Sequence, residues 1–168
     1  MSVELPEAKI LAEQMNHELK GKRAKSFLVK DCERLQRIGM MDKDLKSFNQ
    51  LVDGKIETVA SRGNVIRVKF DNGANLILGP EYGGEIFYRK TTKNVPKFHL
   101  RVDFSDATLL TVRLTSMGVI QALKDDELER SYVYKRDFDS TKLSPIVKGF
   151  TFERFSEKIA EHPYKLVI

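Results

Sequence analysis

The feature that most constrains the fold is a change of hydrophobic period at Lys55. From this residue onward, side chains alternate in character with a period of two, first around the turn sequence SRGN and then around Asn72-Gly73, a strong hairpin dipeptide. The clearest alternation lies between 97 and 114, where one face carries Phe98, Leu100, Val102 and Phe104. Several short strands in succession predict a sandwich or a barrel, and we expect an antiparallel β-sandwich.

Helical patterns flank this β region. Over 5–20, apolar residues recur at steps of three and four, and Gly21 follows as a C-terminal stop. The segment 22–31 predicts a strand, and 43–54 predicts a short helix. Thr151 can cap a last helix, which Pro163 limits at its far end. The expected fold class is therefore mainly β with flanking helices, one of them a long N-terminal helix.

Composition narrows the class of protein. The chain has 168 residues, 41% hydrophobic and 32% charged, which is enough for one globular domain with its own core. Its single cysteine, Cys32, forms no internal disulfide, and we expect a buried or neutral thiol. No apolar stretch is long enough to cross a membrane, and the early acidic residues do not fit a signal peptide. We therefore expect a cytoplasmic protein.

The charge balance is compatible with several partners. A formal charge of +5 permits nucleic acid as a partner without demonstrating one. The basic clusters at 20–25 and 34–37 fit either DNA-backbone contacts or solvated faces. The three histidines are too scattered for a metal motif, and His99 is expected to be a pairing or surface residue of a strand.

Two stretches carry a family resemblance. The first, VELPEAKILAEQMNHELKGKRAKSF, has Glu-Leu-Pro-Glu ahead of a long helix that closes in Leu-x-Gly-Lys. The second, LVDGKIETVASRGNVIRVKFDNGANLILG, leads from a Gly-Lys strand through Arg-Gly to a hairpin that ends in Leu-Gly. In both, the chain resembles the formamidopyrimidine-DNA glycosylase and endonuclease VIII family, and the resemblance covers that family's N-terminal domain.

The resemblance implies a domain organisation and a partner. Residues 1–145 would form the family's β-sandwich catalytic-type domain, and residues 146–168 a linker and helix that lead to a C-terminal domain. The apolar run 166–168 also predicts that a second domain follows. The family's zinc finger would lie in that C-terminal region, so no cofactor is expected in this chain. The implied partner is double-stranded, damaged DNA. We expect the protein to bind it as a monomer and to have no membrane partner.

The resemblance also assigns the catalytic positions. The family's nucleophile is the amine of an N-terminal proline, whereas the matching residue here is Val3, whose nitrogen is locked in a peptide bond. The α-amine of Met1 or Ser2 could replace it. Glu4 matches the catalytic glutamate and Glu7 the second acidic position, although both are also acids favoured near a helix start.

Four further residues are the expected DNA contacts. Arg62 lies in the Arg-Gly turn, where it is a phosphate contact or an ordinary turn arginine, and Asn64 stands where the family has a phosphate-binding lysine. Tyr82 and Met117 lie in the two glycine-bearing loops that match the family's DNA-opening wedge. A methionine such as Met117 is more often a core residue than a wedge.

The sequence thus leaves several functions open. The chain resembles a DNA glycosylase and AP lyase of base excision repair, which would bind damaged DNA and excise oxidised bases. One alternative is a catalytically lapsed member that only binds DNA or another ligand, and a second is a monofunctional glycosylase in which Glu4 activates water. An interaction scaffold without a nucleic-acid role is a third.

Overall fold

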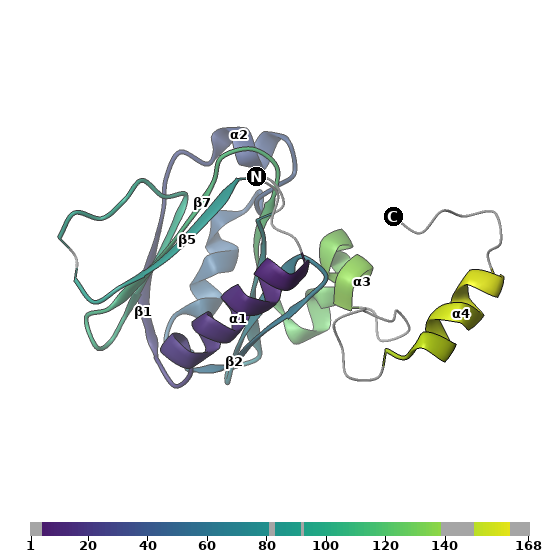
Figure 1. Cartoon of the computed structure of the whole chain (residues 1–168). Coiled ribbons are helices and arrows are strands. Elements are labelled where there is room, and N and C mark those ends of the chain that lie inside the picture. Colours follow the sequence, from purple (N-terminus) through teal and green to yellow (C-terminus); the bar gives the residue numbers. More distant parts are fainter. Residues whose placement is uncertain (1–4, 81–82, 92, 139–149, 162–168) are drawn as a thin grey trace.

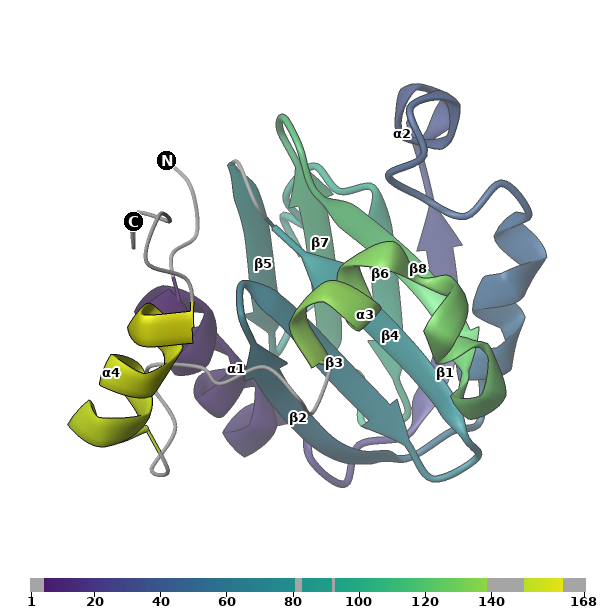
Figure 2. The ribbon, with the colours of Figure 1, turned by 90° about the vertical axis from the view of Figure 1, so that its right-hand side faces the viewer.

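The computed structural model describes residues 5–80, 83–91, 93–138 and 150–161. Within these ranges, eight strands form two antiparallel sheets, with the orders β1-β6-β7-β5 and β2-β3-β4-β8 (Figures 1 and 2). The strands are β1 (Ala24–Val29), β2 (Ile56–Arg62), β3 (Val65–Phe70), β4 (Ala74–Gly79), β5 (Gly84–Arg89), β6 (Leu100–Phe104), β7 (Leu109–Leu114) and β8 (Val119–Lys124). The predicted antiparallel β-sandwich is confirmed.

The two predicted hairpins form where the turn residues allow positive φ. Arg62 pairs with Val65 across a two-residue turn, in which Gly63 has a φ of +59°. Gly73 has a φ of +78° in the turn between β3 and β4. Glycine adopts a positive φ without the steric cost that a Cβ brings, so Gly63 and Gly73 allow the two tight turns that join the strands.

The core lies between the two sheets and follows the predicted alternation. Leu100, Val102 and Phe104 of β6 are buried, as are Leu110 and Val112 of β7. Phe98 precedes β6 and is half-buried. Burial of these alternate residues leaves the other side of β6 and β7 on the outer face of the first sheet.

Helices close the two open edges of the sandwich. Along one edge runs α1 (Leu5–Leu19), which buries Ala12, Met15 and Leu19 against the core. The Asn16 side chain also accepts a hydrogen bond from the backbone N–H of Val59 at 2.8 Å, which ties α1 to β2. The other edge, between β1 and β8, is covered by a short helix, η1 (Leu45–Leu51). The predicted helix over 43–54 is therefore shorter than expected and is a 3-10 helix.

A second layer covers the outer face of the sheet β2-β3-β4-β8. It consists of η2 (Asp125–Arg130) and α3 (Tyr132–Phe138), which lie across the strands in Figure 2. Leu128 and Val133 of this layer pack on Val65 and Ile77 of the sheet. The sequence patterns did not predict η2, α3 or the five-residue helix α2 (Glu33–Arg37).

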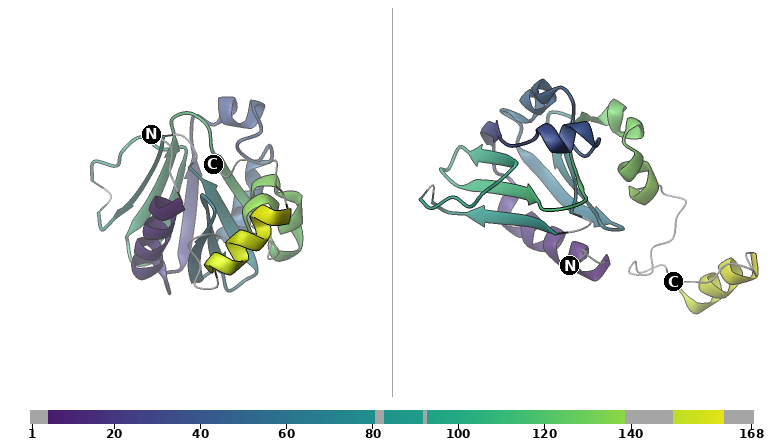
Figure 3. Two further views of the ribbon diagram at one scale, coloured as in Figure 1. Left: turned by 45° about the vertical axis from the view of Figure 1, so that its right-hand side comes forward. Right: turned by 90° about the horizontal axis from the view of Figure 1, so that it is seen from above.

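The last described helix is α4 (Phe152–Glu161), which the Thr151 signal predicted. The Thr151 hydroxyl accepts from the backbone N–H of Arg154 at 3.3 Å, as an N-cap does. Seen from above in Figure 3, α4 is set apart from the sandwich. Its first residue, Phe152, is exposed. None of the helices in the described ranges combines the length and apolar character needed to span a bilayer.

Candidate nucleic-acid interface

The start of α1 and the β2–β3 turn come to the same end of the sandwich. The Gly21 N–H donates to the Ile56 carbonyl at 2.8 Å, and the Asn16–Val59 bond lies further along both elements, so α1 runs back along β2. From Leu19 to Glu7 the helix rises about 18 Å, close to the roughly 20 Å that β2 covers from Ile56 to its end. Glu7 in the first turn of α1 is exposed near this end, whereas Glu4 lies outside the described residues.

The two glycine-bearing loops reach the same end. A Cβ added at Gly79, the last residue of β4, would lie 3.8 Å from Val65 Cγ2 and 3.7 Å from Val119 Cβ. Gly79 therefore stands between the first residues of β3 and β8. The Thr115 N–H donates to the Gly83 carbonyl at 2.9 Å, which joins the loop after β7 to the loop before β5.

Of the two residues predicted to act as a DNA-opening wedge, Met117 lies within the part of the chain that the structure describes. Its side chain is 50% exposed, so the interpretation of Met117 as a core residue is wrong. Tyr82, the candidate in the neighbouring loop, lies outside the described residues. Exposure of a large apolar side chain next to Gly118 leaves Met117 available to contact a partner at this end.

The β2–β3 turn itself is covered by the end of α3. One Nη2 hydrogen of Arg136 points to Asn64 Oδ1 at 3.0 Å, and the same guanidinium holds Asp137 through Nε at 2.7 Å and Nη2 at 2.9 Å. Arg62 ends β2 at the same turn and is half-buried. The sequence analysis did not predict Arg136 and Asp137 as site residues. The only local signal was the run of charged residues at 135–137.

The basic cluster at 20–25 lies at the opposite end. Lys22 forms an ion pair with Asp106, and the guanidinium of Arg23 donates to the carbonyl of Asp53. The Ala24 N–H, in the same segment, bonds Gly54 at 2.9 Å, just before the start of β2. These bonds tie the segment to the loop before β2, which favours a structural role over DNA-backbone contacts.

Two residues singled out for their chemistry are accounted for by packing. Cys32 is buried, as expected, and burial raises the pKa of its thiol. His99 Nδ1 accepts from the backbone N–H of Leu114 at 3.0 Å, and burial lowers the pKa of the imidazole. His99 is thus a pairing residue, as expected.

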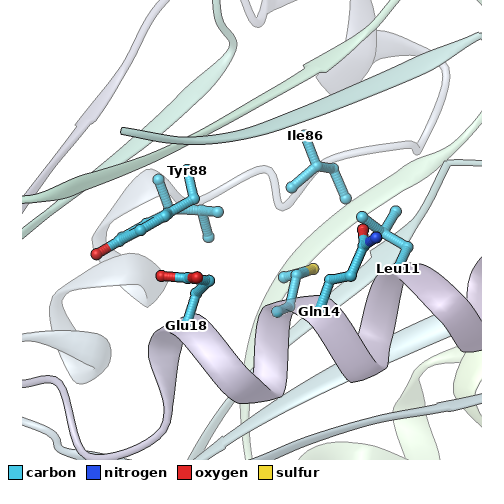
Figure 4. Close-up of a pocket in the computed structure, with 7 residues that line it drawn as sticks. Leu11, Gln14, Glu18, Ile86 and Tyr88 are labelled. Carbon is cyan, nitrogen blue, oxygen red and sulfur yellow. The ribbon is translucent and has the colours of Figure 1, made fainter. Parts of the chain in front are cut away.

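A separate pocket of about 370 Å³ lies between α1 and β5 (Figure 4). Leu11, Met15 and Ile86 give it an apolar floor, and Glu18 and Tyr88 face each other at one end. None of its lining residues is basic. Because a phosphate needs positive charge, this pocket is not part of the candidate interface.

Comparison with known proteins agrees with this geometry. A sequence model of the formamidopyrimidine-DNA glycosylase N-terminal domain matches residues 3–117. The chain belongs to this family. Val3 is the first matched residue, and the β2–β3 turn and the loop before β5 lie in the matched part, which ends at Met117, one residue before Gly118. No curated protein sequence gives a significant match.

Solved structures of the family share the fold. MutM in complex with DNA that contains carbocyclic 8-oxo-G has a TM-score of 0.72 at 19% identity, over 94% of this chain and 57% of that chain. The Lactococcus lactis formamidopyrimidine-DNA glycosylase, non-covalently bound to DNA with an AP site, has a TM-score of 0.72 at 18% identity, over 94% and 58%. The chain thus spans less than two thirds of the length of these glycosylases.

Proposed function

We propose that this chain is the DNA-binding N-terminal domain of a base excision repair protein, and that its ligand is double-stranded DNA with a damaged base. The observation that carries the proposal is the convergence of the β2–β3 turn, the two glycine-bearing loops and the first turn of α1 at one end. Relatives of this fold were solved with DNA that carries 8-oxo-G or an AP site.

Within this proposal, each candidate residue has a role. Arg62 and Asn64 face the DNA backbone at the β2–β3 turn, because the turn presents a cation and an amide donor. Tyr82 and Met117 enter the space that an extruded nucleotide leaves, because their side chains are large and apolar. Glu4 is the acid-base group of the reaction and Glu7 a second acid beside it.

The chemistry that we propose is base excision without a Schiff base at residue 3. The Val3 nitrogen is part of a peptide bond, because Ser2 precedes it, and its lone pair is delocalised into that bond. A water activated by Glu4 needs no amine. Borohydride trapping separates the two mechanisms, since only an amine nucleophile leaves a covalent adduct with DNA.

We also propose that the chain continues the domain order of its family, with residues 1–145 as the β-sandwich domain and 146–168 as a linker and helix that lead to another domain. The exposed Phe152 of α4 supports this assignment, since an apolar side chain in that position fits a helix that packs against a further element. Binding as a monomer and a cytoplasmic location belong to the same proposal.

Duplex binding at two salt concentrations tests the function. Fluorescence anisotropy would compare an oligonucleotide that carries one abasic-site analogue with an undamaged duplex. We expect selective binding that weakens as salt rises, because phosphate contacts release counterions. Arg62→Ala should weaken binding, whereas Lys25→Ala is the matched control, since Lys25 is exposed on β1 next to Ala24 at the opposite end. Equal loss in both variants, or no binding at either salt, contradicts the proposal.

A further inference from the structure

The last residues of α3 form an ion pair directly over the β2–β3 turn. Arg136 and Asp137 meet as two parallel hydrogen bonds, Nε to Oδ1 at 2.7 Å and Nη2 to Oδ2 at 2.9 Å. Arg136 Nη2 also donates to Asn64 Oδ1 at 3.0 Å, across 72 positions of sequence. A guanidinium group therefore lies at the turn even though Asn64 itself carries no charge.

The Asp137 carboxylate is pressed against the turn backbone. A Cβ added at Gly63 would lie 2.6 Å from Asp137 Cγ and 2.7 Å from Asp137 Oδ2. The Asp137 side chain is only 11% exposed. An internal carboxylate thus fills the space over Gly63 that a bound anion at this turn would need.

The position of this ion pair is fixed by the rest of α3. Val133 is buried on the sheet, and the rings of Tyr134 and Phe138 stack with their centroids 5.0 Å apart. The Tyr134 ring also lies 5.7 Å from the guanidinium of Arg67 on β3. Because these contacts hold α3 on the sheet, Arg136 and Asp137 stay over the turn even when the ion pair between them is broken.

The chemistry of the pair indicates what else can bind there. The guanidinium group donates two parallel hydrogen bonds to a carboxylate or to a phosphate with the same geometry. The carboxylate of Asp137 occupies that geometry on Arg136. A phosphate oxygen pair can replace it by forming equivalent bonds to Nε and Nη2, while Asn64 Oδ1 keeps the guanidinium at the turn.

We propose that Arg136 is the phosphate-binding side chain of the β2–β3 turn and that Asp137 is its internal competitor. The inference rests on the proposed function, because it places a DNA phosphate at this turn. Asn64 is a positioning residue: its amide oxygen accepts from Arg136, which a lysine ammonium at position 64 could not do. The positive charge at the turn thus comes from Arg136 of α3, and the carboxylate of Asp137 lowers the affinity of Arg136 for phosphate.

Removing the competitor tests the proposal. Asp137→Asn keeps the size of the side chain against Gly63 and removes its charge, so duplex binding should become about two- to fivefold tighter at low salt, because the phosphate no longer competes with a charged carboxylate for Arg136. The slope of log K against log salt should steepen by about 0.9, the value for one added phosphate contact. Adding Arg136→Ala to Asp137→Asn should abolish the gain.

The control separates a local effect from net charge. Asp126→Asn removes one exposed carboxylate from η2, close to Asp125, whose N–H bonds Gly73 at the far end of β3. It makes the same change in net charge as Asp137→Asn and should leave both affinity and slope at the wild-type values. An equal gain in Asp126→Asn would overturn the proposal, because the effect would then be long-range charge.

A titration with inorganic phosphate decides the proposal independently of DNA. The amide signal of Gly63 should shift in a saturable way in Asp137→Asn, only weakly in the wild type, and not in Asp137→Asn/Arg136→Ala. If no variant binds duplex DNA while Gly63 responds as described, the proposed function fails and the anion site stands. If wild type binds DNA and Asp137→Asn matches it in both assays, the assignment of Arg136 and Asp137 is wrong and the function stands.

Discussion

Gly118 packs directly against the carbonyl oxygen of Gly79, and a Cβ at position 118 would lie 2.6 Å from that oxygen. This contact joins the loop after β7 to the end of β4, which are the two segments that carry the glycines of the candidate interface. Backbone atoms cannot move aside as a flexible side chain can, so the contact explains why residue 118 has no side chain.

Gly118→Ala should therefore destabilise the fold and displace the loop that carries Met117. We expect a loss of about 1–3 kcal/mol in the free energy of unfolding, as for other overpacked sites. Urea denaturation measures it. Gly79→Ala is the matched control, because its Cβ would meet its nearest neighbours at 3.7–3.8 Å, an ordinary contact distance. A Gly118→Ala variant as stable as Gly79→Ala would show that the loop can move without cost.

Asp106 should make stability depend on pH in the acid range. Its hydrogen bonds with Lys22 and Thr108 lower the pKa of the carboxyl from 3.8 to about 2. Because the folded state binds this proton less tightly than the unfolded state, the contribution is complete above pH 3.8 and is lost as pH falls towards about 2. Thermal unfolding of wild type and Asp106→Asn should converge across this window. Parallel curves would mean that the ion pair contributes no pH dependence.

His99 should add a second pH dependence near neutrality. Burial, and next the charge of Arg113, lower the pKa of the imidazole from 6.5. The neutral ring accepts the Leu114 N–H, so its contribution to stability is present above pH 6.5 and is lost as pH falls through the lower folded pKa. An NMR titration of the ring should give a midpoint below 6.5, and His99→Gln should remove the corresponding fall in melting temperature.

Local signals explain which parts of the fold could be predicted. The hairpins at Gly63 and Gly73 follow from short turns with a glycine at positive φ and from alternation within each strand, both of which are visible in a short window. By contrast, α3 has only seven residues and depends on packing of Val133 against Val65 and Ile77. Helices of this length are not stable alone, so no local pattern marked it.

The same difference applies to the candidate site. Arg62 and Asn64 were predicted because the turn sequence is contiguous and resembles a family motif. Arg136 contacts Asn64 across 72 positions, so only the fold brings the two side chains together. The exposure of Met117 also depends on the tertiary structure, because its loop is shaped by the contact between Gly118 and Gly79.

Asp42 offers a test of how the chain before η1 is attached to the sandwich. Its carboxylate accepts from the buried Ala122 N–H at 2.8 Å and from the Ser47 hydroxyl at 2.9 Å, and burial raises its pKa above 3.8. The folded state therefore binds the proton more tightly, and stability should fall as pH rises from 3.8 through the raised pKa. Asp42→Asn removes this dependence, because an amide has no charge to bury.

The two substitutions of Asp42 should differ at neutral pH. Both bonds end on Asp42 Oδ2, and the amide oxygen of Asn can accept from the Ala122 N–H and the Ser47 hydroxyl in the same way, so Asp42→Asn should be at least as stable as wild type. Asp42→Ala leaves a buried backbone N–H without its acceptor, which costs about 1–3 kcal/mol. Urea denaturation of both variants at pH 7 measures the difference. Equal losses would mean that the charge of Asp42, and not its role as acceptor, holds this segment on β8.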